Sequence, residues 1–88
     1  MALYLISYDL IQTKNYPKLH DAIRKYGNYC KPLESTWIIQ TADTTINIRD
    51  YCLQYIDIDD RLFVVKLEAD TAAWYNLPAD VPNWLKAR

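Results

Sequence analysis

The opening nine residues constrain the fold most strongly, because they read as one apolar β-strand that ends in a carboxylate. The run 3–8 is apolar on both faces, which predicts a central strand of a sheet. Asp9 follows where the chain leaves that sheet. A carboxylate fixed at a strand end either caps the loop that follows or binds a metal ion. The residues alone leave both interpretations open.

Size and composition predict one globular domain. The chain has 88 residues, of which 51% are hydrophobic and 24% charged. We expect a folded domain over residues 1–68 and a C-terminal aromatic arm over 69–88. No apolar run approaches the length of a membrane span, and the N-terminus lacks a charged leader region, so we expect a cytoplasmic protein. Cys30 and Cys52 are too few for a disulfide framework and fit small core positions.

The charge distribution permits one basic face without requiring it. The net charge is −1, which argues against strong nucleic-acid binding by electrostatics alone. Residues 1–33 nevertheless hold five basic against two acidic side chains, while the remainder holds five basic against nine acidic ones. Lys14, Lys18, Arg24 and Lys25 are therefore candidates for contacts with a phosphate backbone. A solvated helix face is the alternative for each of them.

Hydrophobic spacing and breaker residues predict the order strand, helix, two strands, helix, strand. A first helix is expected between Asn15 as N-cap and Gly27. Residues 29–41 predict two strands, or one strand broken near Pro32, and either Asp43 or Thr44 can cap a second helix. Residues 57–60 are expected to form a charged turn. Glu68 falls at the twelfth place of a calcium loop counted from Asp57, but the sixth place is Leu62 instead of glycine and the fifth is Arg61. Residues 61–67 are the last strand.

This order is the βαββαβ pattern of an α+β, ferredoxin-like sandwich, with one antiparallel sheet and two helices on one face. Residues 3–8 and 62–65 are apolar on both faces, although the two helices cover only one. A second copy of the chain is the simplest cover for the other face, so we expect a homodimer. The prolines of residues 69–88 disfavour a helix there, and we expect an extended arm that packs on its own or the partner's sheet.

Three segments resemble a known family. The strand Tyr4–Leu10, the helix that ends in Lys25-Tyr26-Gly27, and Glu34-Ser35-Thr36-Trp37 are similar to elements of the small CRISPR-associated endonuclease of spacer acquisition and its relative, virulence-associated protein D. The segments Leu-Glu-Ser-Thr-Trp and Asp-Asp-Arg-Leu-Phe-Val-Val look closer still to the relatives labelled as SinR-family proteins. The resemblance spans about residues 3–67.

The resemblance implies a ferredoxin-like homodimer that stacks its two sheets. Members have been described as metal-dependent nucleases on RNA or duplex DNA, and others as non-catalytic adaptors. By this resemblance Asp9 corresponds to the acidic residue of a Mg²⁺ or Mn²⁺ site, and Ser35 and Trp37 to the serine and aromatic residue of a strand motif. The family's glutamine and glutamate around that motif are Leu33 and Ile38 here, and its arginine-rich stretch is reduced to Lys14 and Lys18.

We therefore expect a metal-dependent endonuclease that acts on RNA or DNA, with Asp9 and Ser35 as catalytic residues and a role in phage defence. Two copies of Asp9 at a two-fold axis could share one ion. The alternative is a non-catalytic homodimeric adaptor or nucleic-acid-binding module. His20 is expected on a helix face in solvent, and we do not assign it as a base.

Overall fold

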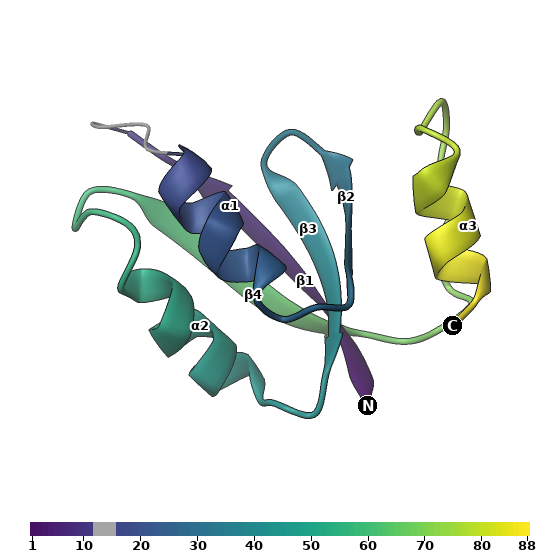
Figure 1. Cartoon of the computed structure of the whole chain (residues 1–88), viewed down its shortest axis with the longest axis horizontal. Helices are drawn as coiled ribbons and strands as arrows, with labels where there is room; N and C mark the ends of the chain where they lie inside the picture. The colour runs from purple at the N-terminus through teal and green to yellow at the C-terminus, as the bar shows by residue number, and fades with distance from the viewer. Residues whose placement is uncertain (12–15) are drawn as a thin grey trace.

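The computed structural model describes residues 1–11 and 16–88 and shows a small α+β domain (Figure 1). Its elements in chain order are β1 (Ala2–Asp9), α1 (Tyr16–Arg24), β2 (Tyr29–Leu33), β3 (Thr36–Thr41), α2 (Thr45–Leu53), β4 (Arg61–Leu67) and α3 (Asp80–Lys86). The four strands form one sheet in the order β2-β3-β1-β4, and every neighbouring pair is antiparallel. The expected α+β class is confirmed. The architecture is compatible with a ferredoxin-like class, to which α3 is an addition.

The first strand is central, as its apolar character predicts. It pairs with β3 on one side and with β4 on the other, with Ile6 opposite both Trp37 and Val64. Residues 29–41 form two strands, and the register of β2 shifts between Cys30 and Leu33, the stretch that contains Pro32. A proline donates no ladder hydrogen bond, so an irregular edge strand accommodates it.

One face of the sheet is covered by α1 and α2 (Figure 1). The even-numbered side chains of β1 point toward these helices because side chains alternate along a strand. Thr44 is the N-cap of α2, and its Oγ1 accepts a hydrogen bond from the amide of Asn47. Gly27 lies at φ +85° just after α1, a conformation that other residues rarely adopt. The buried core of this face consists of Tyr4, Ile6, Tyr8, Leu10, Leu19, Ile23, Trp37, Ile39, Ile48 and Cys52.

The opposite face carries a smaller core that the C-terminal segment builds with its own sheet. Val81 of α3 is fully buried against Leu3, Cys30 and Ile38. The expected extended arm is therefore wrong for residues 80–86, which form a helix beside β2 (Figure 1). Pro82 is tolerated because it lies in the first turn, where backbone N–H groups have no partner within the helix.

Part of this second face stays open. Phe63 is 62% exposed, and Leu5 and Val65, which pair across β1 and β4, are only half-buried. Nearby, a hollow of about 410 Å³ separates the sheet from the C-terminal segment, with Leu3, Leu5, Leu67, Trp74 and Leu85 among its lining residues. Within the part of the chain that is described, no helix combines the length and apolarity needed to cross a membrane.

Candidate functional site

Asp9 is exposed at the end of β1, opposite Arg61 of β4. Strand alternation puts its side chain on the same face as Leu5 and Ser7, away from α1 and α2. It contributes to a shallow hollow of about 170 Å³ that is lined by Ser7, Tyr8, Asp9, Arg61, Leu62 and Phe63. The carboxylate is thus accessible, on the face of the sheet that remains partly open.

The loop after Asp9 is held by a different carboxylate. The amide of Ile11 donates to Oδ1 of Asp60 at 2.7 Å, and the amide of Asp57 donates to Oδ2 of the same residue at 2.7 Å. Asp60 therefore closes the charged turn of residues 57–60 and ties it to the end of β1. The amides of residues 12–15 lie outside the described part of the chain, so the capping interpretation of Asp9 stays a prediction.

Ser35 lies in the turn between β2 and β3 rather than in a strand. Its carbonyl oxygen accepts a hydrogen bond from the amide of Tyr8 at 3.1 Å, which brings this turn to the end of β1. Asp9 and Ser35 thus come to the same end of the sheet. The strand expected at Ser35 is wrong, because the β-hairpin turns at Glu34 and Ser35 before β3 begins at Thr36.

The basic residues predicted to bind phosphate lie elsewhere. Lys18, Arg24 and Lys25 are exposed on α1 or just after it, and α1 covers the face opposite to Asp9. Lys14 lies outside the described residues. A single protomer therefore does not bring this basic group and the Asp9 carboxylate to one side of the sheet.

Metal binding at Asp9 would need ligands from elsewhere. Among residues 1–11 and 16–88, no three His, Cys, Asp or Glu side chains gather as a metal site. Cys30 and Cys52 are buried free thiols, and burial raises their pKa values to about 11 and about 12. These thiols stay protonated core groups at neutral pH, as the sequence predicted.

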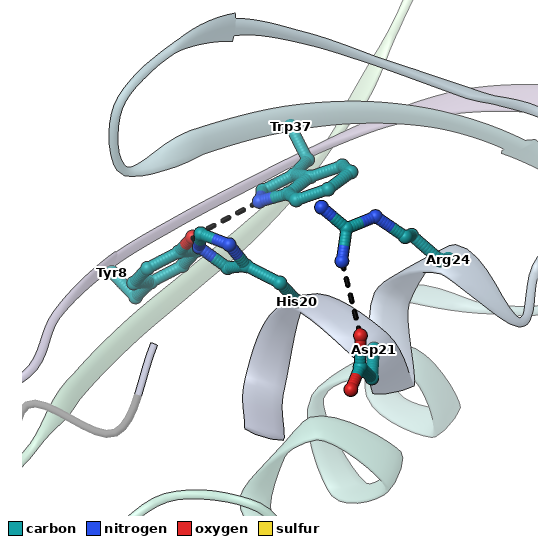
Figure 2. Close-up of polar contacts among 5 residues, drawn as sticks. All are labelled: Tyr8, His20, Asp21, Arg24 and Trp37. Atoms are coloured by element: carbon teal, nitrogen blue, oxygen red, sulfur yellow. Dashed lines mark hydrogen bonds and ion pairs between the residues drawn. The ribbon is translucent and has the colours of Figure 1, made fainter. Parts of the chain in front are cut away.

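A second cluster, around His20, was missed by sequence reasoning. His20 is half-buried rather than free in solvent, and its Nε2 lies 2.6 Å from the Tyr8 hydroxyl (Figure 2). The indole Nε1–H of Trp37 donates to that same hydroxyl at 3.0 Å. An indole N–H can only donate, so the Tyr8 oxygen accepts from Trp37. The tautomer of His20 sets which group donates in the hydrogen bond between the Tyr8 hydroxyl and Nε2.

The surroundings keep this cluster neutral. Burial lowers the pKa of His20 below its ordinary value of 6.5, and the nearby Lys31 and Arg24 cations lower it further. Burial raises the pKa of Tyr8 to about 12, although the hydrogen bond from Trp37 opposes that shift. The spacing Tyr16, His20, Arg24 at every fourth residue was the sequence signal for one helix edge. That Tyr8 of β1 and Trp37 of β3 lie beside His20 could be seen only in the folded structure.

No protein-family model matches the sequence.

Proposed function

We propose that this chain is a metal-dependent phosphodiesterase that cleaves nucleic acid, RNA or DNA, as a ferredoxin-like homodimer. Asp9 would bind Mg²⁺ or Mn²⁺, and the ion would activate a water as the nucleophile. The observation that carries the proposal is the position of Asp9: exposed, at the end of the central strand, on the partly open face of the sheet. The resemblance to the CRISPR-associated endonuclease family supports it.

The dimer belongs to the same proposal. Phe63, Leu5 and Val65 leave apolar surface on this face, and a second sheet packed against it would remove that surface from water. A two-fold axis there would bring two Asp9 carboxylates toward each other, which would add a second carboxylate ligand to the site. Ser35, at the same end of the sheet, would orient a phosphate or a water. The biological setting that we propose is phage defence in the cytoplasm.

The test is a cleavage assay with labelled single-stranded RNA and duplex DNA in Mg²⁺, Mn²⁺ or EDTA. Wild-type protein should cleave only with metal, and Asp9→Ala and Asp9→Asn should fall to the rate seen in EDTA. Asp59→Ala removes an exposed acidic side chain from the nearby turn and should keep wild-type activity. Equal cleavage by wild type and Asp9→Asn would exclude Asp9 as the catalytic ligand.

The second candidate is a non-catalytic homodimeric adaptor or nucleic-acid-binding module. The apolar surface around Phe63 favours it, because association would bury that surface whether or not a metal binds. Under this hypothesis folded wild-type protein forms a dimer, binds the labelled strands or a protein partner, and leaves them uncut under every metal condition.

A further inference from the structure

Three polar groups surround the buried Trp37 ring on the helix-covered face. The His20 ring centre lies 5.2 Å from that of Trp37, the Arg24 guanidinium 5.5 Å and the Lys31 ammonium 5.9 Å. Figure 2 shows His20 and Arg24 extending from α1 to the Trp37 side chain on β3. Lys31 comes from β2. Segments that are separate in the sequence thus bring two cations and an imidazole to one indole.

His20 uses one ring nitrogen within the cluster and leaves the other available. Its Nε2 is occupied by the Tyr8 hydroxyl, while Nδ1 contacts no hydrogen-bond partner among the described residues. The side chain is half-buried, and the Tyr8 hydrogen bond fixes the direction of the ring.

Arg24 and Lys31 each form an ion pair with a carboxylate that is exposed to solvent. Arg24 contacts Asp21 at 3.0 Å, and Lys31 contacts Glu34 at 3.7 Å. The Asp21 and Glu34 side chains are 75% and 87% exposed. Solvent-exposed ion pairs of this kind contribute little free energy, so an incoming anion can replace the carboxylates at small cost.

We propose that His20, Arg24 and Lys31 form a binding site for a phosphate group of single-stranded nucleic acid. The imidazole would donate one neutral hydrogen bond from Nδ1, and the two cations would supply charge-assisted hydrogen bonds to the phosphate oxygens. This site lies on the face opposite to Asp9. It does not depend on catalysis at Asp9.

Neighbouring aromatic rings favour a nucleotide over a bare phosphate. The Tyr16 ring lies 5.8 Å from His20, and the Tyr29 ring lies 5.5 Å from Trp37. Both tyrosines are only half-buried, so part of each side chain is accessible. Stacking of a base on an aromatic ring strengthens the binding of single-stranded nucleic acid. A strand whose phosphate occupies the cluster can place bases next to these rings.

The sequence contains one histidine, so the imidazole NMR signals of full-length protein report on His20 alone. We would titrate wild-type protein with inorganic phosphate, uridine monophosphate and a short oligouridylate. His20 signals should shift in a saturable way, and the oligouridylate should bind at least about tenfold more tightly than inorganic phosphate, since one stacked base suffices for that ratio.

Variants distinguish binding at this site from attraction of the oligouridylate by the net charge of the protein. Arg24→Gln and Lys31→Gln should each weaken oligouridylate binding about tenfold, as expected for one charge-assisted hydrogen bond. Arg49→Gln is the matched control, because Arg49 is an exposed arginine on α2 that also pairs with a neighbouring carboxylate, Asp50. It should bind like wild type. All titrations are made in EDTA, so that no metal ion is bound at Asp9 and failure of the catalytic proposal would leave this result intact.

Three outcomes would overturn the inference. Unchanged His20 signals with all three ligands would show that the cluster binds no phosphate. Equal affinities for inorganic phosphate and oligouridylate would exclude nucleic acid as the ligand. Equal losses in Arg24→Gln and Arg49→Gln would show that binding follows net charge alone.

Discussion

The two faces of the sheet differ in how completely the chain covers them. On the helix-covered face, Ile6 is fully buried and Tyr8 is joined to His20 and Trp37 by hydrogen bonds. On the other face, α3 covers the region around Leu3 and Ile38, while Phe63 stays 62% exposed. The same strands thus build a closed core on one side and an incomplete one on the other.

Substitutions on the two faces should therefore have different effects. The closed face buries its apolar side chains within one chain, so substitutions in that core change the stability of a single chain. The open face has apolar surface still to bury, so substitutions there should act on association. Four predictions test this division, beginning with the largest expected effect.

The largest effect is expected at Ile6. Ile6→Ala should lower the free energy of unfolding by about 2–5 kcal/mol, because it removes buried methyl groups and leaves a cavity in close-packed surroundings. Ile46→Ala makes the same substitution at a side chain that is 60% exposed on α2 and should change stability by less than about 0.5 kcal/mol. Urea unfolding measures both. Equal effects would contradict the closed core.

Tyr8→Phe should have the next largest effect and lower the free energy of unfolding by about 1–3 kcal/mol. The Trp37 side chain is 1% exposed, and without the Tyr8 hydroxyl its indole N–H has no acceptor among the described residues. Tyr75→Phe removes a hydroxyl from a side chain that is 91% exposed and should be neutral. A neutral Tyr8→Phe in the same unfolding experiment would show that the hydrogen bond contributes nothing.

A smaller, pH-dependent effect is expected at His20. Its pKa in the folded state is lowered from 6.5 by burial, Lys31 and Arg24, with Glu34 and Asp21 opposing. The unfolded chain therefore binds the proton first, and stability falls as pH drops from above 6.5 toward the folded-state pKa. Below that pKa the loss levels off.

The measurement is the urea midpoint between neutral and mildly acidic pH. His20→Gln lacks the titrating group and should show a shallower fall than wild type over this window. If the urea midpoints of the two proteins fall in parallel as pH drops, the pKa of His20 is the same in the folded and the unfolded chain.

The smallest effect on the stability of one chain is expected at Phe63. Phe63→Ser should change the monomer's free energy of unfolding by less than about 0.5 kcal/mol, since the side chain is largely exposed. It should nevertheless convert a wild-type dimer to a monomer in analytical ultracentrifugation. Leu53→Ser, at an apolar side chain that is 48% exposed on α2, should remain dimeric. A wild type that stays monomeric at high concentration would remove the dimer from the proposal.

Sequence periodicity predicted the secondary structure well where the local signal was strong. Apolar strands, a cap at Asp43 or Thr44 and the glycine after α1 identified the elements up to residue 67, because each depends on neighbours in the chain. The structure uses Thr44 as the cap. The helix at residues 80–86 was missed. Pro82 argued against it, and the burial of Val81 against Leu3 and Cys30 that favours it is a long-range contact.

The candidate sites also differ in whether a local sequence signal or a long-range contact identifies them. Asp9 could be singled out because its position at a strand end is a local property. The turn at Ser35 and the placement of α1 on the opposite face followed only from the pairing of strands. For His20, sequence reasoning predicted a helix position beside basic residues and exposure to solvent. The Tyr8 hydroxyl that holds its ring is twelve residues away in the chain and comes from β1.

The α+β class, the central position of the first strand and the carboxylate at its end thus followed from the amino-acid sequence. Those features depend on residue spacing and local conformational preference, which a short window of sequence contains. The face that Asp9 occupies, the closure of part of the second face by α3, and the contact of Tyr8, His20 and Trp37 followed from the three-dimensional packing. Those outcomes depend on packing between residues distant in the chain, where burial and hydrogen-bond satisfaction select one arrangement.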